Sequence, residues 1–111
     1  IEKGNQVWAE LVEAIKDSTL LLVVFSENYA SSTWCLNELV EIMECHKYGQ
    51  VVVPVFYKID PSHVRKHTGS YRTALAKHKM QAGKNDDKMM QNWKNALSQA
   101  ANLSGFDSNS P

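Results

Sequence analysis

Two short apolar runs stand out along the chain, one over residues 19–25 and one over residues 51–57. Each has the length of a β-strand, is rich in β-branched residues and carries no charge. Such a run is typical of a strand in a parallel sheet, so we expect residues 19–25 to be buried on both faces. Pro54 interrupts the second run, and because proline removes a ladder donor we expect a local irregularity there.

Around these runs, apolar residues recur at intervals of three and four, which predicts amphipathic helices. The predicted helices cover residues 6–16, about 33–48, 70–80 and 88–103, with a short helical turn at 63–67 and a short strand at Phe106. Gly49 is a natural helix stop. Trp93 and the pair Met89 and Met90 are interpreted as core of the last helix. Strands that alternate with helices predict an α/β fold with parallel pairing through right-handed crossovers.

The polar turn after residues 19–25 is the candidate functional corner. Ser31, Ser32 and Thr33 are N-cap candidates for the helix that follows. In an open α/β sheet ligands bind beside the carboxyl ends of the strands, and a helix N-terminus there offers N–H groups to a phosphate. Trp34 and Glu38 share one helix face, where an indole could stack on a flat ring beside a carboxylate. Spacing alone favours the simpler interpretation, a half-buried core tryptophan and a solvated glutamate.

Composition excludes some partners but leaves others open. The 111 residues fit one domain, and 12 Lys and Arg balance 12 Asp and Glu, so net charge does not favour nucleic acid or an anionic membrane. The charges are unevenly placed: residues 1–57 hold three cations against eight acids, and residues 58–84 hold seven cations against Asp60 alone. Such asymmetry fits association between copies, and equally a solvated surface.

The remaining chemistry-bearing residues point to a reduced compartment without a metal. Cys35 and Cys45 would lie about 15 Å apart on one helix, beyond disulfide reach. His63 and His67 have metal-ligand spacing but lack a third ligand, so no metal site is expected. The apolar runs are too short to span a membrane. We expect a cytoplasmic protein, with the nucleus left open as a second compartment.

Two long motifs resemble the TIR (Toll/interleukin-1 receptor) domains of plant TIR-type disease-resistance proteins. The first joins residues 26–30 (SENYA) to 34–39 (WCLNEL), and the second is residues 54–65 (PVFYKIDPSHVR). Weaker matches lie at residues 69–71, His78, Trp93 and residues 101–105. Motifs of this length in this order are specific. The resemblance implies a flavodoxin-like parallel sheet of order 2-1-3-4-5 with helices on both faces.

The resemblance also implies an activity, cleavage of the bond between nicotinamide and ribose in NAD⁺. It assigns the catalytic carboxylate to Glu38 and places Trp34 against the flat ring or sugar of the substrate. Ser32 and nearby N–H groups would hold a hydroxyl or phosphate, and Gly4 would belong to a loop over the pocket. NAD⁺ is then the substrate, and neither a cofactor nor a metal is implied.

The family pattern begins with a strand, a helix and a second strand and closes with a helix, none of which this sequence shows. By that resemblance residues 1–111 are a single TIR domain truncated at its N-terminus and lacking the last helix. We therefore expect NAD⁺ cleavage from the complete domain and weak or no activity from this chain alone.

Two alternative hypotheses are considered, and the first of them stays open. The chain could be a non-catalytic TIR–TIR interaction module, with a basic surface around Arg65, Lys66 and Arg72 facing an acidic helix through Glu41 and Glu44. A response regulator of similar fold would need an acidic cluster at its strand ends. Asp60 is the only aspartate near a strand end, so this reading is disfavoured.

Overall fold

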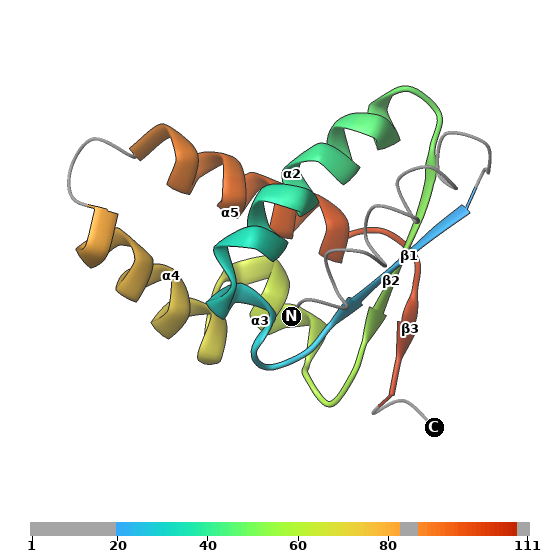
Figure 1. Ribbon diagram of the computed structural model, residues 1–111. Coiled ribbons are helices and arrows are strands. Elements are labelled where there is room, and N and C mark those ends of the chain that lie inside the picture. The colour runs from blue at the N-terminus through green and yellow to red at the C-terminus, as the bar shows by residue number, and fades with distance from the viewer. Residues whose placement is uncertain (1–19, 83–86, 109–111) are drawn as a thin grey trace.

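The computed structural model describes residues 20–82 and 87–108. Strands and helices alternate along this part of the chain, as the sequence predicts (Figure 1). The elements are β1 (Leu20–Phe25), the 3₁₀ turn η1 (Tyr29–Ser31), α2 (Thr33–Lys47), β2 (Val51–Phe56), α3 (Pro61–Lys66), α4 (Ser70–Ala82), α5 (Asp87–Ala101) and β3 (Phe106–Asp107). The helix expected over residues 6–16 lies outside the described residues.

The three strands form a parallel sheet in the order β1-β2-β3, which confirms the α/β fold class. β1 pairs with β2 in continuous register from Leu20 opposite Val51 to Phe25 opposite Phe56. Just past these strands, the amide of Tyr57 donates to the carbonyl of Phe25 at 2.8 Å. Because the strands are parallel, their carboxyl ends meet at one edge of the sheet, where ligands of such folds bind.

The irregularity expected at Pro54 is absent, and that prediction was wrong. Pro54 pairs with Val23 with no break in register on either side. On the other side of β2, β3 pairs only with Val55 and Phe56, so at Pro54 strand β2 has a ladder partner in β1 alone, although Gly105 lies close to the proline there. The proline therefore occupies a position that is locally an edge, where a lost donor is tolerated.

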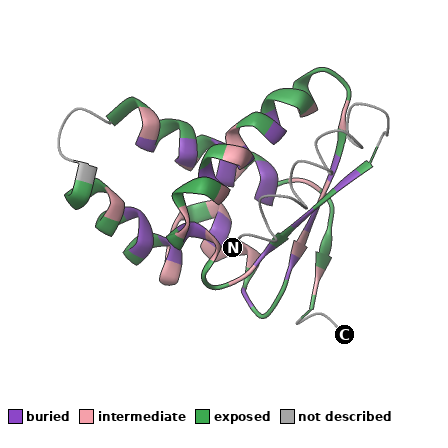
Figure 2. Ribbon diagram, viewed as in Figure 1, coloured by how far each residue is buried: buried purple, intermediate pink, exposed green. Residues whose placement is uncertain are grey.

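The prediction that β1 is buried on both faces was also wrong for the described structure. Leu21, Val23 and Phe25 are buried, whereas the alternate residues Leu20, Leu22 and Val24 are 52%, 53% and 54% exposed. Of the described helices, α2 and α5 pack against β2. Figure 2 shows these helices on one side of the sheet. Burial consequently follows the two-residue period of a strand with one covered face.

The core fills the space between this sheet face and the helices. Phe25 stacks on Phe56 at 5.7 Å between ring centroids and receives Tyr29 edge-on at 4.8 Å. From α5, Trp93 is 1% exposed and Met90 is 6% exposed, which confirms both as core residues. The apolar stripe of α5 thus anchors the helical layer to the sheet.

Two helix termini are set by local chemistry, the first of them at the predicted stop Gly49. α2 ends before Gly49, whose φ of +100° is readily adopted only by glycine and whose amide donates to the carbonyl of His46 at 3.2 Å. α3 begins after Asp60, whose carboxylate accepts from the amide of Ser62 at 2.8 Å. That bond lowers the pKa of the Asp60 carboxyl below its usual value.

Candidate functional site

The candidate site lies where β1 ends and α2 begins. Among the three N-cap candidates the structure selects Ser32, whose hydroxyl oxygen accepts from the amide of Cys35 at 3.2 Å. The backbone of Ser32 is extended, with φ −99° and ψ 114°, as an N-cap requires. Capping uses a lone pair of the hydroxyl oxygen, so the hydroxyl hydrogen can still serve a ligand.

The structure places Trp34 and Glu38 on the first two turns of α2, one turn apart on the same side of the helix. Trp34 is 36% exposed, in contrast to the fully packed Trp93, and Glu38 is half-buried. A partly exposed indole next to a partly shielded carboxylate can meet a flat, positively charged group. Gly4, the fourth predicted site residue, lies outside the described residues.

Three side chains of α4 hold the loop that leads into this site. The hydroxyl of Tyr71 donates to the carbonyl of Ser26 at 2.7 Å, and that of Ser70 donates to the carbonyl of Glu27 at 2.8 Å. About two turns further along the helix, Nε2 of His78 donates to the carbonyl of Ala30 at 2.8 Å. Because every acceptor is a main-chain carbonyl, the loop backbone itself is fixed against α4.

A second link fixes the rotation of α2. The His78 ring meets the Trp93 indole edge-on at 5.5 Å between centroids. The indole Nε1–H of Trp93 donates to Oδ1 of Asn37 at 2.9 Å. Asn37 immediately precedes Glu38, so a contact from the α5 core orients the turn that carries the candidate carboxylate.

The sequence did not predict these positioning contacts. It identified His78 only as a weak family match and Trp93 as a weak family match and a core residue, and it predicted no separate role for Asn37. The available signal was that His78 interrupts the apolar face formed by Tyr71, Ala74 and Leu75. A polar side chain on a packed face generally has a specific hydrogen-bond partner.

Two phenols, the partly buried Tyr29 and the buried Tyr71, support the same corner from inside. Tyr29 donates its hydroxyl to the carbonyl of Cys35 at 3.2 Å, in the first turn of α2. Burial raises the pKa of both Tyr29 and Tyr71 above the ordinary tyrosine value. Both phenols therefore stay neutral at pH 7 and act as hydrogen-bond donors rather than bases.

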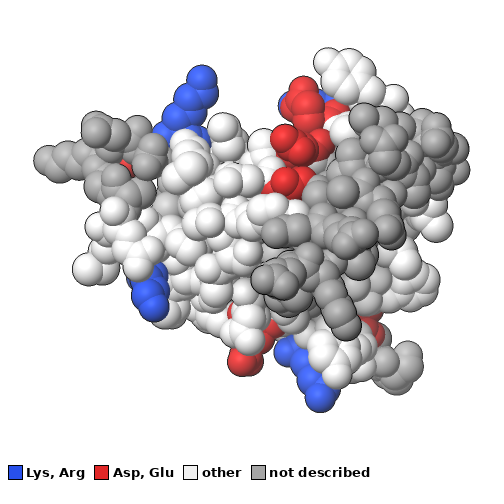
Figure 3. All heavy atoms as spheres, viewed as in Figure 1, with Lys and Arg blue, Asp and Glu red and all other residues white. Residues whose placement is uncertain are grey.

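The charged side chains along α2, next to the candidate site, are mainly acidic. Glu41 and Glu44 are exposed on this helix, and Figure 3 shows acidic side chains gathered on that part of the viewed face. One of them, Glu44, pairs with Lys47 at 3.3 Å in an exposed ion pair, which contributes little to stability.

The histidines with metal-ligand spacing are engaged in structural hydrogen bonds. Nδ1 of His63 lies 2.7 Å from the hydroxyl of Thr68, and Nε2 of His67 lies 2.9 Å from the carbonyl of Lys94. Over residues 20–82 and 87–108, no three His, Cys, Asp or Glu side chains gather as a possible metal site. None of the helices described has the length and apolar character needed to cross a membrane.

A parallel sheet with a polar corner between a strand end and a helix N-terminus defines an α/β domain, a fold class in which ligands generally bind beside the carboxyl ends of the strands. The TIR domain family matches residues 1–111, and the chain belongs to that family.

Similar proteins agree with this assignment. The chain is 48% identical over 110 residues to Disease resistance protein RUN1 of Vitis rotundifolia, covering 96% of this chain and 8% of that protein. It is 49% identical over 106 residues to TMV resistance protein N of Nicotiana glutinosa, covering 95% of this chain and 9% of that protein. The chain thus spans less than a tenth of the length of these relatives.

A solved structure with the same fold is that of the TIR domains in the activated Roq1 resistosome that directly recognizes the pathogen effector XopQ. The similarity has a TM-score of 0.78 at 48% sequence identity and covers 88% of this chain and 59% of that chain. This agreement extends the family assignment from sequence to three-dimensional structure.

Proposed function

We propose that this TIR domain cleaves NAD⁺ with Glu38 as the catalytic carboxylate. The observation that carries the proposal is the placement of Trp34 and Glu38 on one face of α2, beside the carboxyl end of β1. In the reaction, the bond between ribose C1′ and the pyridinium nitrogen breaks and its electron pair leaves with neutral nicotinamide. Water, or a hydroxyl of the substrate, then bonds to C1′ and releases a proton.

Each residue of the corner has a role that its environment supports. The carboxylate of Glu38 would stabilise the oxocarbenium character that develops on the ribose as the bond breaks. The exposed edge of Trp34 would pack against the flat ring or the sugar. Ser32 and the first amides of α2 would bind a hydroxyl or phosphate oxygen at the positive end of the helix. Gly4 is proposed to belong to the loop that covers the substrate.

We propose further that the domain acts in plant innate immune signalling and cell death through association with other TIR domains, in the cytoplasm. Support comes from the relatives, which are disease-resistance proteins, and from the resistosome in which the similar TIR domains were solved. NAD⁺ is the proposed small-molecule partner and is consumed as a substrate.

The decisive variant is Glu38→Gln, made in the protein with its native flanking sequence. It keeps the size of the side chain and removes its charge. The matched control is Glu41→Gln, three residues along the same helix and exposed. We expect nicotinamide release to fall at least about a hundredfold in Glu38→Gln, the range for losing one transition-state stabiliser, and to stay near wild type in the control. Melting temperatures of both variants should match the wild type.

Undiminished nicotinamide release in a folded Glu38→Gln protein would remove Glu38 as the catalytic group. A wild-type protein that releases no nicotinamide at any concentration, yet associates, would instead support the second candidate, a non-catalytic interaction module. The exposed acidic residues Glu41 and Glu44 favour that candidate, because they could meet the basic side chains of Arg65, Lys66 and Arg72 on another copy. Association of this kind should weaken with added salt.

A further inference from the structure

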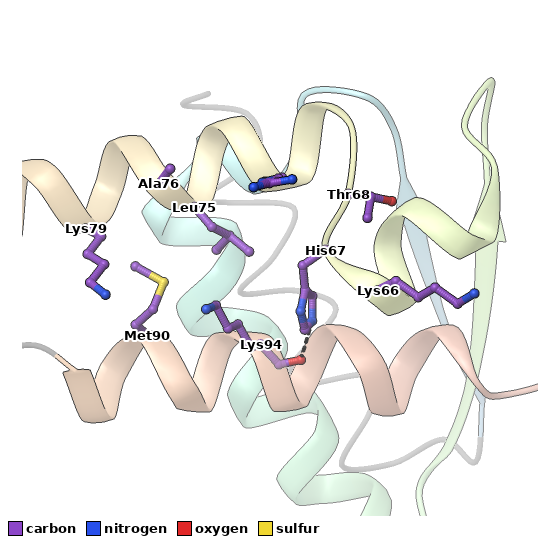
Figure 4. Close-up of a pocket in the computed structure, with 9 residues that line it drawn as sticks. Lys66, His67, Thr68, Leu75, Ala76, Lys79, Met90 and Lys94 are labelled. Carbon is purple, nitrogen blue, oxygen red and sulfur yellow. Dashed lines mark hydrogen bonds between the residues drawn. The ribbon is translucent and has the colours of Figure 1, made fainter.

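A hollow lies away from the candidate site, between the end of α3 and the facing helices α4 and α5. Its volume is about 440 Å³, within the range of small-molecule sites, about 300–1,000 Å³, and Figure 4 shows the side chains that line it. None of its lining residues belongs to the corner formed by Ser32, Trp34 and Glu38. We refer to it as the basic pocket.

Among the described residues, the lining of the basic pocket includes cations and no acidic side chain. The cations are Lys66, Arg72, Lys79 and Lys94. Within residues 20–82 and 87–108, no carboxylate lies within ion-pair distance of these four cations. Like charges around one hollow repel one another, so an anion between them removes that repulsion.

Two of the cations are directed at the same space. Lys79 on α4 and Lys94 on α5 extend toward the gap between their helices, whereas Lys66 extends away from it (Figure 4). Leu75 and Met90 lie beside them and give the same space an apolar wall. Paired ammonium groups next to an apolar wall match a ligand that has a charged end and a flat or apolar body.

The wall on the α3 side is held rigidly. His67 closes α3 in the left-handed conformation, with φ 58° and ψ 50°, which is uncommon outside glycine. Its Nε2 lies 2.9 Å from the carbonyl of Lys94 and 3.0 Å from the hydroxyl of Ser98. That hydroxyl donates to the carbonyl of Arg65 at 2.8 Å. The end of α3 is thereby bonded to α5 before any ligand arrives, so binding requires little further ordering.

We propose that the basic pocket binds a phosphorylated small molecule of nucleotide size. The phosphate lies between Lys79 and Lys94, and the flat or apolar part of the ligand packs on Leu75 and Met90. α4 connects this site to the candidate catalytic corner, because the helix that supplies Lys79 also supplies Tyr71 and His78 to the loop carbonyls. Binding itself does not depend on NAD⁺ cleavage.

The test is isothermal titration with three probes: adenosine monophosphate, inorganic phosphate and uncharged adenosine. Adenosine monophosphate should bind at least tenfold more tightly than either inorganic phosphate or adenosine, because only it uses both the cations and the apolar wall. The pocket variant is Lys79→Gln with Lys94→Gln. The matched control is Lys77→Gln with Lys47→Gln, which removes the same charge at exposed positions outside the pocket.

Affinity for adenosine monophosphate should fall at least tenfold in the pocket variant and stay within twofold of wild type in the control. Trp34→Ala distinguishes this site from the catalytic corner, and it should leave the affinity unchanged. Equal affinity in the pocket and control variants would overturn the proposal, as would a loss of binding in Trp34→Ala alone. Binding of inorganic phosphate and adenosine monophosphate with equal affinity would show a general attraction for anions and would also overturn it.

Discussion

The bond between Trp93 and Asn37 gives the most quantitative prediction, because it joins a core residue to the turn before Glu38. In Trp93→Phe the phenyl ring lacks two carbons and the indole nitrogen. Trp93 is 1% exposed, so the two carbons are lost from a packed site at about 0.8 kcal/mol each. Loss of the hydrogen bond to Asn37 adds about 1 kcal/mol.

The expected destabilisation is therefore about 2.5 kcal/mol, or roughly 10 °C in melting temperature for a domain of this size. Asn37→Ala leaves the Trp93 indole N–H without its partner and should cost about 1–2 kcal/mol. Because both single variants remove the same bond, the double variant should cost about 1 kcal/mol less than their sum. Urea unfolding followed by far-UV circular dichroism measures all three.

A matched control lies on the exposed side of the same helix. The amide of Gln91 donates to Oδ1 of Asn95 at 2.9 Å, a bond of equal length made in solvent. Gln91→Ala and Asn95→Ala should each change stability by less than about 0.5 kcal/mol, with little coupling between them. If the Trp93 and Asn37 variants are additive within about 0.3 kcal/mol, the bond does not link α5 to α2 and the positioning argument fails.

Two further predictions test the corner and the sheet. Burial raises the pKa of Tyr71, so as pH rises above about 10 the unfolded phenol ionises first and wild-type stability falls. Tyr71→Phe should be about 1 kcal/mol less stable than wild type at pH 7. Urea midpoints should show this difference in stability narrowing between pH 9 and 11, and a constant difference would contradict the role of Tyr71 as a buried neutral donor. In Gly105→Ala the new Cβ would clash with the carbonyl oxygen of Pro54 and lie 2.7 Å from Cγ of Pro54. Thermal melts should therefore show a loss of stability of about 1–3 kcal/mol. Gly49→Ala is the control, because its new Cβ meets no atom and only the positive φ is strained; it should lose about 1 kcal/mol of stability. If the two glycine variants lose equal stability, the clash with Pro54 does not explain the effect at Gly105.

The sequence predicted most of the elements because their signals are local. Apolar periodicity located α2, α4 and α5 within a few residues, and Gly49 was correctly predicted as the stop of α2. The helical turn expected over residues 63–67 is α3, which begins two residues earlier at Pro61. The N-cap was limited to three adjacent residues, and the extended backbone of Ser32 decided between them.

What the sequence did not predict depends on distant partners. Ser70, Tyr71 and His78 donate to main-chain carbonyls of residues 26–30. Every residue has such a carbonyl, so the sequence does not indicate which of them accepts a hydrogen bond. The composition of β1 suggested two buried faces, yet composition does not say which neighbours cover a strand. The sequence predicts a basic surface for partners around Arg65, Lys66 and Arg72. Only the folded arrangement brings two of these, Lys66 and Arg72, together with Lys79 and Lys94 around one hollow.

The bonds that organise the candidate corner have a consequence for how the protein is made. Ser70, Tyr71, His78 and Trp93 follow their partners in the chain by 43, 45, 48 and 56 residues. During synthesis, Glu38 leaves the ribosome long before the side chains that orient its helix exist. Contacts of such separation form late, because a long loop must close before they stabilise anything. A nascent chain that stops before α5 would therefore contain Glu38 but lack the Trp93 contact that orients its helix. The candidate corner can be organised only after α5 has been synthesised and packed.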